Sequence, residues 1–429
     1  MMSQANRIEI VNGRLIDPAN NIDGEQDLFI ENGKVCAIGS APDAFKADAT
    51  IDAKGQIVCP GLVDLSARMR EPGQEQKATI ESETRAAAKG GITTICCPPD
   101  TNPVVDTPAV ASMIYHKSME IGYARVLPIG ALTQGLEGNQ LSEMMALTKA
   151  KCPVLSNAYA PLANTLVERR ALEYAATFGI TIFIRPEDRH LRDSGCVHEG
   201  PVSARLGLPG IPEAAESVAV ARDLALAAHT GCTIHFHALS TATALEMITH
   251  AQKKGTQITA GVAAHQLHLT EECVENFNSN CHVIPPLRTR EDMEQLRQGV
   301  ANGVVKAICS DHQPHDPDAK ELPFPSTTPG ISSLETLLAL TLKLVDDGAI
   351  KMADAIARIT SGPAEILGLP LGQLGVGADA DVCIFDPNRS WTLQTDSMLS
   401  AGKNTPFLNQ EFKGEVTHTL FQGKLVYQA

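Results

Sequence analysis

The sequence predicts an α/β fold: a (β/α)8 TIM barrel with a small β-sandwich domain formed by both chain termini. Three observations favour this fold. Short apolar runs alternate with helical patterns in the middle of the chain, the first fifty-odd residues alternate in the strand period, and the last fifty do the same. A length of 429 residues is sufficient for one such barrel and a second, smaller domain.

The elements follow in order along the chain. The N-terminal segments IEIVNGRLID and DLFIENGKVCAIG alternate as strands and contain Asn-Gly turns. A helical pattern that ends at Gly231 is one of those that separate the apolar runs. The C-terminal segments DADVCIFDP and GEVTHTLFQGKLVY return to the strand period. We therefore assign residues 1–55 and 366–429 to the sandwich and residues 56–365 to the barrel. The eight apolar runs expected to form the barrel strands are 62–68, 92–99, 124–132, 152–158, 180–186, 232–238, 257–264 and 305–311.

The composition narrows the classes of function. The net charge is −15 and no lysine- and arginine-rich run occurs, which argues against nucleic acid and against an anionic membrane as partners. No apolar run is long enough for a membrane span, and the first residues do not resemble a signal peptide. The eleven cysteines are scattered without CxxC spacing, as expected for reduced thiols. We expect a cytoplasmic protein.

Function in a barrel is expected at the C-terminal ends of the strands. In those places the sequence resembles the dihydroorotase family, with motifs in the same order along nearly the whole chain. The motifs are PGLVDLSARMREPG, GGITTICCPPDTNP, IPPLR, SDHQPH, TPGISSLET and KNTPF, together with PAEILGL and GADADVCIFDP, which are widespread in cyclic amidohydrolases. The resemblance implies the same barrel and sandwich. It also implies hydrolysis or closure of a cyclic amide with one or two divalent metals.

The resemblance implies metal ligands that this sequence has replaced. The His-x-His of the first strand is Ser66-Ala67-Arg68, and a guanidinium cannot deprotonate to bind a metal. The strand-four carboxylate or carboxylated lysine corresponds to Asn157, and the strand-five histidine corresponds to Arg185. We therefore expect no metal and no other cofactor. The degenerate ligand positions are Ser66, Arg68, Asn157, Arg185, His237 and Asp311.

The ligand positions on the sixth and eighth strands differ from the others. The strand-six ligand falls on His237 or on Ala238, depending on a shift of one residue. Asp311 keeps the strand-eight aspartate that moves the proton in the family, so it is a vestigial catalytic group. Because Arg68 and Arg185 replace ligands, we expect one or both to pair with Asp311, or with Asp100 nearby.

The substrate contacts that the resemblance implies are also changed. Arg70 matches the arginine that binds the substrate carboxylate, but Asp100 and Ile284 each replace an asparagine. An apolar residue at 284 leaves a polar substrate atom unpaired, at a cost of about 1–3 kcal/mol. We expect these three to be vestigial substrate-binding positions.

The other polar residues near these motifs have simpler expected roles. His235 and His237 share one face of a strand and could hold one metal together with Asp311, although a structural role is more common for such histidines. Asp64 is expected to be structural and Glu71 to cap a loop. The histidines expected to position loops are His265, His268, His312 and His315.

Three functions remain open. The first, which we favour, resembles the inactive dihydroorotase-like subunits that associate with aspartate transcarbamoylase in pyrimidine synthesis. It implies a non-catalytic protein in a hetero-oligomer with the catalytic subunit of that enzyme. The second is an active cyclic amidohydrolase with a reduced or mononuclear zinc site. The third is a sensor that binds a dihydroorotate-like anion through Arg70 without converting it.

Overall fold

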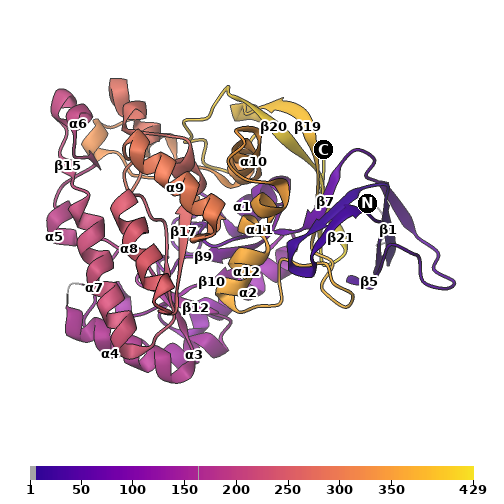
Figure 1. Ribbon diagram of the computed structural model, residues 1–429, viewed down its shortest axis with the longest axis horizontal. Helices are drawn as coiled ribbons and strands as arrows, with labels where there is room; N and C mark the ends of the chain where they lie inside the picture. Colours follow the sequence, from indigo (N-terminus) through magenta and orange to yellow (C-terminus); the bar gives the residue numbers. More distant parts are fainter. Residues whose placement is uncertain (1–5, 163) are drawn as a thin grey trace.

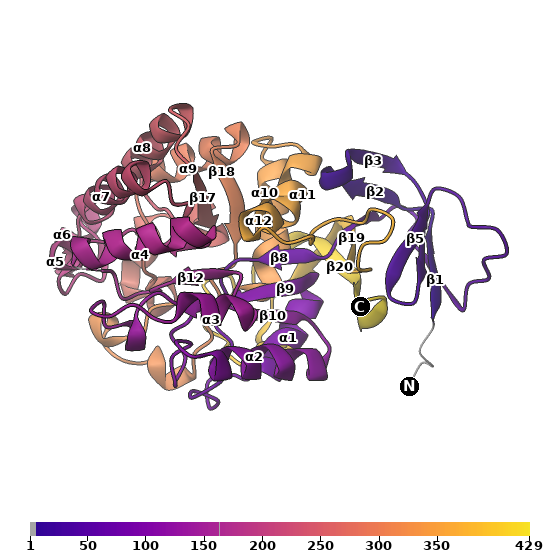
Figure 2. The same ribbon diagram turned by 90° about the horizontal axis from the view of Figure 1, so that it is seen from below.

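The computed structural model describes residues 6–162 and 164–429. It consists of a barrel surrounded by helices and a β-sandwich at one side, where the first and last strands lie together (Figures 1 and 2). The fold class predicted from the sequence is confirmed.

All eight predicted barrel strands form, and each pairs in parallel with the next. The third is divided into two short strands by an irregularity. The ring closes where Arg68 N donates to His312 O at 2.9 Å and Ala67 forms a parallel bridge with His312. The strands are β8 (Leu62–Asp64), β9 (Ile92–Cys97), β10 (Arg125–Pro128), β11 (Gly130–Ala131), β12 (Val154–Ser156), β13 (Thr181–Ile184), β16 (Ile234–Phe236), β17 (Ile258–Ala263) and β18 (Val305–Cys309).

Helices surround the barrel, and several begin and end at the residues that favour helix termini. Thr79 and Thr289 accept backbone N–H groups at the starts of α1 and α9, and Gly231 ends α7 in the left-handed conformation. The helices are α1 (Ile80–Lys89), α2 (Pro108–Ile121), α3 (Met144–Lys149), α4 (Thr165–Phe178), α5 (Arg189–Arg192), α6 (Pro201–Leu206), α7 (Ala214–Thr230), α8 (Ala242–Lys253), α9 (Arg290–Asn302), α10 (Leu337–Asp346), α11 (Met352–Ile359) and α12 (Ser361–Leu367). A short parallel pair, β14 (Val197–His198) and β15 (Gly210–Ile211), lies between α5 and α7. No helix in the described ranges is both long and apolar enough to cross a membrane.

The sandwich contains two sheets, with aliphatic side chains such as Ile10, Leu28 and Ile384 in the core between them. One sheet has the order β5 (Lys34–Ile38), β4 (Leu28–Glu31), β1 (Arg7–Val11), β6 (Ala49–Asp52). The other has the order β21 (Lys424–Gln428), β20 (Glu411–Phe421), β19 (Val382–Thr392), β7 (Ile57–Pro60), β2 (Arg14–Asp17), β3 (Ile22–Glu25).

The sandwich extends further along the chain than predicted. We assigned residue 56 onward to the barrel, but β7 pairs antiparallel with β19 and parallel with β2. Its apolar sequence is almost continuous with the first barrel run, so the alternation of side chains could not separate the two. The first boundary between the domains therefore lies after Pro60.

Glu83 on α1 joins three distant segments of the chain. Its buried carboxylate accepts hydrogen bonds from His312 Nε2 at 2.7 Å, Ser400 Oγ at 2.7 Å and Ala401 N at 3.0 Å. Because His312 Nδ1 accepts from Ser333 N at 2.9 Å, the ring proton lies on Nε2. His312 thus positions the strand-eight loop, as expected.

A second buried cluster joins α4 to α7. Glu168 and Asp223 lie against one guanidinium, with Arg222 Nε 3.0 Å from Glu168 Oε2 and 2.8 Å from Asp223 Oδ1. Burial, together with the charge of Asp223, raises the pKa of Glu168 to about 9. One arginine therefore faces two carboxyl groups, of which Glu168 holds its proton at neutral pH.

This proton predicts how stability depends on pH. The pKa of Glu168 is higher in the folded protein than the ordinary value near 4.5. The stabilisation that its bound proton provides is therefore complete below pH 4.5 and is lost as pH rises through about 9. The free energy of unfolding should fall between about pH 5 and pH 9, by up to about 1.4 kcal/mol per pH unit. Glu168→Gln should flatten this slope in urea titrations, whereas Glu173→Gln on the exposed side of α4 should not. An unchanged slope in Glu168→Gln would show that the proton resides elsewhere.

Candidate functional site

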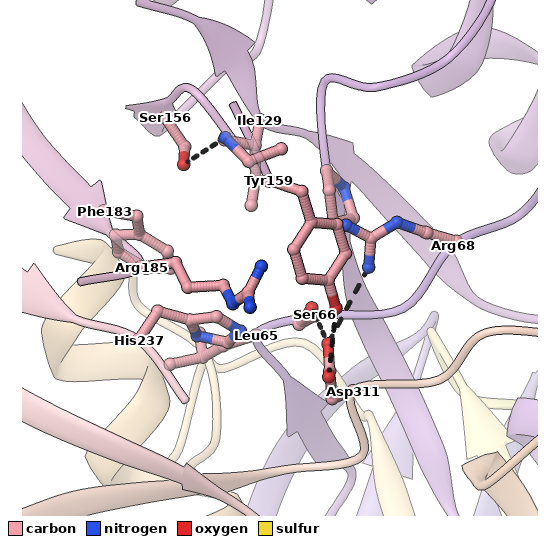
Figure 3. A pocket seen from close by; sticks show the side chains of 12 residues that line it. Leu65, Ser66, Arg68, Ile129, Ser156, Tyr159, Phe183, Arg185, His237 and Asp311 are labelled. Atoms are coloured by element: carbon pink, nitrogen blue, oxygen red, sulfur yellow. Dashed lines mark hydrogen bonds and ion pairs between the residues drawn. The ribbon is translucent and has the colours of Figure 1, made fainter. Parts of the chain in front are cut away.

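The C-terminal ends of the strands enclose a small cavity at the barrel mouth. Its volume is about 30 Å³, which is enough to hold water. Five of the six predicted degenerate ligand positions, Asp311 among them, face it, together with a tyrosine that no motif indicated (Figure 3). The polar residues that line it are Ser66, Arg68, Ser156, Tyr159, Arg185, His237 and Asp311.

Arg68, at the end of the first barrel strand, binds the two acids expected for it. Its Nε and Nη2 atoms each lie 2.9 Å from Asp100 Oδ2. Its Nη1 lies 3.7 Å from Asp311 Oδ1, a separation that permits charge attraction but no hydrogen bond. Burial alone would raise the pKa of Asp311, but nearby positive charge, above all that of Arg68, lowers it. The predicted pairing of Arg68 with Asp100 is confirmed.

Arg185 behaves differently. Its Nη2 donates to Glu187 Oε2 at 2.9 Å, and the other oxygen of Glu187 accepts from Arg192 Nη1 at 3.1 Å. Of the two arginines expected to pair with Asp311 or Asp100, only Arg68 does so, and Arg185 pairs with Glu187 instead. Glu187 is two residues away along an extended segment, where side chains at i and i+2 share a side, so it is the nearer partner.

Tyr159 separates the two guanidinium groups. The Cζ atoms of Arg68 and Arg185 lie 4.3 Å and 4.0 Å from the centre of its ring, which stands between them (Figure 3). Its hydroxyl accepts from Gln313 Nε2 at 2.6 Å and lies 3.4 Å from Asp311 Oδ2. Cation–π contacts of desolvated arginine stabilise such an arrangement by about 2 kcal/mol. The residue follows the fourth strand in a loop, and no pattern in the sequence indicated it.

Of the two candidates on strand six, His237 faces the cavity. Ala238 is buried with a φ of 55° and does not line it. Burial lowers the pKa of His237 to about 4, so its imidazole is neutral at pH 7. His235 lies deeper, with Nδ1 2.9 Å from Thr259 Oγ1 and its ring centre 6.0 Å from that of His237.

Asn157 does not reach the cavity, contrary to the prediction. Its Oδ1 accepts from Thr133 N at 3.1 Å and from Thr133 Oγ1 at 2.9 Å, while its Nδ2 donates to Ala160 O at 2.9 Å. The amide holds the loop that carries Tyr159. Because neighbouring strand residues point to opposite sides, Ser156 takes the place on the cavity wall.

The predicted substrate positions are engaged within the protein. Arg70 Nε donates to Pro314 O at 3.0 Å, and Arg70 Nη2 lies 3.2 Å from His315 Nε2. Asp100 is occupied by Arg68, as described above. Ile284 is buried, and its carbonyl lies 3.3 Å from the Tyr159 hydroxyl. Arg70 and Asp100 are thus already bonded within the protein, and Ile284 has no polar group in its side chain.

The remaining predicted polar residues support loops. Glu71 Oε2 accepts Ile80 N at 2.9 Å, which caps α1, and Asp64 Oδ1 accepts Ser310 N at 2.9 Å. His268 Nε2 lies 2.7 Å from Leu340 O, and His268 Nδ1 lies 3.0 Å from Nη2 of Arg297 on α9. His265 is buried near Asp311. Glu71 therefore has its expected capping role.

The residues at the mouth do not fit a divalent metal. A catalytic metal site needs about three protein ligands, most often imidazoles and carboxylates. Here only His237 and Asp311 are of that kind, whereas two permanently charged guanidinium groups stand beside them. Across residues 6–162 and 164–429, no three histidine, cysteine, aspartate or glutamate side chains are grouped so as to hold a metal ion.

The sequence matches two described families. Residues 55–269 match the family described as dihydro-orotase-like, and residues 193–426 match the amidohydrolase family. A dihydroorotase-like protein of Pseudomonas aeruginosa is 49% identical over 421 residues, which are 98% of this chain and 99% of that protein. A dihydroorotase of Syntrophus aciditrophicus is 44% identical over 423 residues, again 98% and 99% of the two chains.

Solved structures resemble the fold over the same extent. The L-hydantoinase (dihydropyrimidinase) of Arthrobacter aurescens superposes with a TM-score of 0.88 at 23% identity, covering 98% of this chain and 96% of the other. The dihydropyrimidinase of Brevibacillus agri gives a TM-score of 0.84 at 22% identity, covering 98% and 95%. At these identities the likeness concerns the fold alone.

Proposed function

Because the chain belongs to the dihydroorotase-like family of amidohydrolases, we propose that it is a non-catalytic member of that family. In this proposal it binds the catalytic subunit of aspartate transcarbamoylase and supports the assembly and activity of that enzyme in de novo pyrimidine biosynthesis. The observation that carries the absence of catalysis is the pair of buried arginines, Arg68 and Arg185, stacked on Tyr159 at the barrel mouth.

Two physical arguments support the loss of catalysis. The reaction of the family depends on metal-bound water, and the cationic guanidinium groups oppose a second cation in the same low-dielectric space. The cavity of about 30 Å³ is also far smaller than the roughly 300–1,000 Å³ of ordinary small-molecule sites. Tyr159 and the two arginines line this small space.

The choice of partner rests on the resemblance of the sequence to inactive subunits of transcarbamoylase complexes. A retained barrel and sandwich offer broad outer surfaces, and stable association needs about 1,200–2,000 Å² of buried area in total. The sensor alternative has less support, because the Arg70 guanidinium already contacts Pro314 and His315.

Deletion of the gene tests the proposed partner. We expect the deletion strain to lose most of its aspartate transcarbamoylase activity and the enzyme to elute as a smaller particle in size-exclusion chromatography. Complementation with the wild-type chain and with Asp311→Asn should restore both equally, because the proposed role does not use the carboxylate chemically. Unchanged transcarbamoylase activity and particle size after deletion would contradict the proposal.

A second experiment tests the loss of catalysis. We expect the double variant Ser66→His/Arg68→His to show no measurable hydrolysis of dihydroorotate, because Arg185, Asp100 and Ile284 remain unchanged. Elemental analysis of the wild-type chain should find no stoichiometric zinc after dialysis. About one zinc per wild-type chain, or turnover by the double variant, would show that the site is closer to a working one than proposed.

A further inference from the structure

Several polar nitrogen atoms at the barrel mouth lack a hydrogen-bond partner among the described residues. Arg68 Nη1, Arg185 Nε and both ring nitrogens of His237 are buried and have no hydrogen-bond partner. Both arginine side chains are only 7% exposed. An unpaired buried donor costs about 1–3 kcal/mol, and more when it is charged. All three residues line the same cavity, so one acceptor placed there could meet several of them.

The charge balance of the cavity favours a negative acceptor. In the wall of the cavity, Arg68 and Arg185 are positive and Asp311 is the one negative side chain, while Asp100 and Glu187 pair with the two arginines from outside the wall. The excess positive charge belongs to the wider cluster. It contains four arginines, at positions 68, 70, 185 and 192, and three carboxylates, at positions 100, 187 and 311. Water could accept the hydrogen bonds, but it would leave this charge uncompensated at a buried position.

We propose that the cavity binds a small planar monovalent oxyanion, of the bicarbonate, formate or nitrate class, between Arg185 and His237, with Arg68 supplying further positive charge. The site differs from that of Arg70, whose guanidinium contacts the loop at Pro314. It occupies the position where the family places metals, so it rests on the proposed loss of the metal site.

Shape and size support this class of ligand. A guanidinium presents parallel N–H groups that match two oxygens of a planar anion. The neutral imidazole of His237 can donate from one ring nitrogen. A cavity of about 30 Å³ suits an anion of a few atoms better than a nucleotide, and the single excess positive charge of the cluster matches a monovalent anion better than sulfate or phosphate. Phe183 and Ile129 close the remaining wall with apolar surface, which strengthens the attraction.

Thermal unfolding can detect such binding. The full-length protein would be melted in sodium gluconate, whose anion is too bulky to enter, at constant ionic strength, with increasing formate, nitrate, bicarbonate or chloride. We expect formate or nitrate to raise the melting temperature saturably, by about 2 °C or more at saturation. Arg185→Gln should lose the saturable part. Arg192→Gln should keep it, because Arg192 shares Glu187 but does not line the cavity.

The outcomes separate the possibilities. A response to chloride alone would overturn the oxyanion class, and equal responses of wild type and Arg185→Gln would overturn the site. If Arg185→Gln does not fold, a crystal structure of the wild type grown in nitrate decides: a planar four-atom group beside Arg185 supports the proposal, and water alone refutes it. Zinc would be measured on the same sample. Stoichiometric zinc would refute the proposed loss of catalysis, whereas absent zinc with no anion response would refute this inference alone.

Discussion

Replacing Glu83 by alanine is expected to lower the free energy of unfolding by about 3–5 kcal/mol, the range for breaking a buried charged network. The carboxylate is fully buried and accepts hydrogen bonds from three distant donors, His312, Ser400 and Ala401, and a fourth from its neighbour Ser82. Burial alone would raise the pKa of Glu83, but the bond from His312 and the other donors lower it, so the group is ionised at neutral pH. Alanine would leave all three donors without an acceptor in a dry environment.

Urea denaturation followed by circular dichroism measures this effect. Glu81→Ala is the matched control, because Glu81 is an exposed acid in the first turn of the same helix, and its loss should cost only a few tenths of a kcal/mol. Glu83→Gln should fall between the two, since the amide retains one acceptor oxygen. A loss below about 1 kcal/mol for Glu83→Ala would contradict the assigned network.

Arg68→Met is expected to destabilise the protein by about 2–4 kcal/mol at neutral pH. The substitution keeps much of the apolar volume but removes the positive charge nearest to Asp311, which is 6% exposed. Asp100 also loses its partner, but it is 26% exposed and can be solvated. The principal cost should therefore come from the uncompensated charge of Asp311.

A double-mutant cycle isolates that interaction. Adding Asp311→Asn to Arg68→Met should recover about 1–3 kcal/mol, because the neutral amide no longer needs a counter-charge. Adding Asp100→Asn instead should recover less. If Arg68→Met unfolds at the same urea concentration as the wild type, Arg68 does not neutralise the barrel mouth and the account of the site fails.

The barrel could be predicted from the sequence because each of its strands is a short apolar run between helical patterns. The sandwich could be predicted because both ends of the chain alternate polar and apolar residues. The position of β7 could not, since Ile57–Pro60 is uniformly apolar and buried, like a barrel strand. Its pairing with β2 and with β19, which lies more than 300 residues later, assigns it to the sandwich.

Contacts in the candidate site could be predicted where both partners lie in recognisable motifs of the sequence. The pairing of Arg68 with Asp100 follows from replacing a ligand by a guanidinium beside a new acid. The partner of Arg185 was not identified, because the nearby Glu187 was not weighed against the more distant acids. Tyr159 could not be identified, because the place of a loop side chain depends on the packing of several segments that lie far apart in sequence.

The pairing of β7 with β19 also constrains the order in which the protein folds. One neighbour of β7, β2, precedes it in the chain, but a ribosome that has made β7 must add more than 300 residues before the other neighbour, β19, exists. Until then β7 has an unpaired apolar edge, the kind of edge that joins other chains and aggregates. Such distant contacts form slowly because a long loop must close first. This sheet can therefore be completed only after most of the chain has been made.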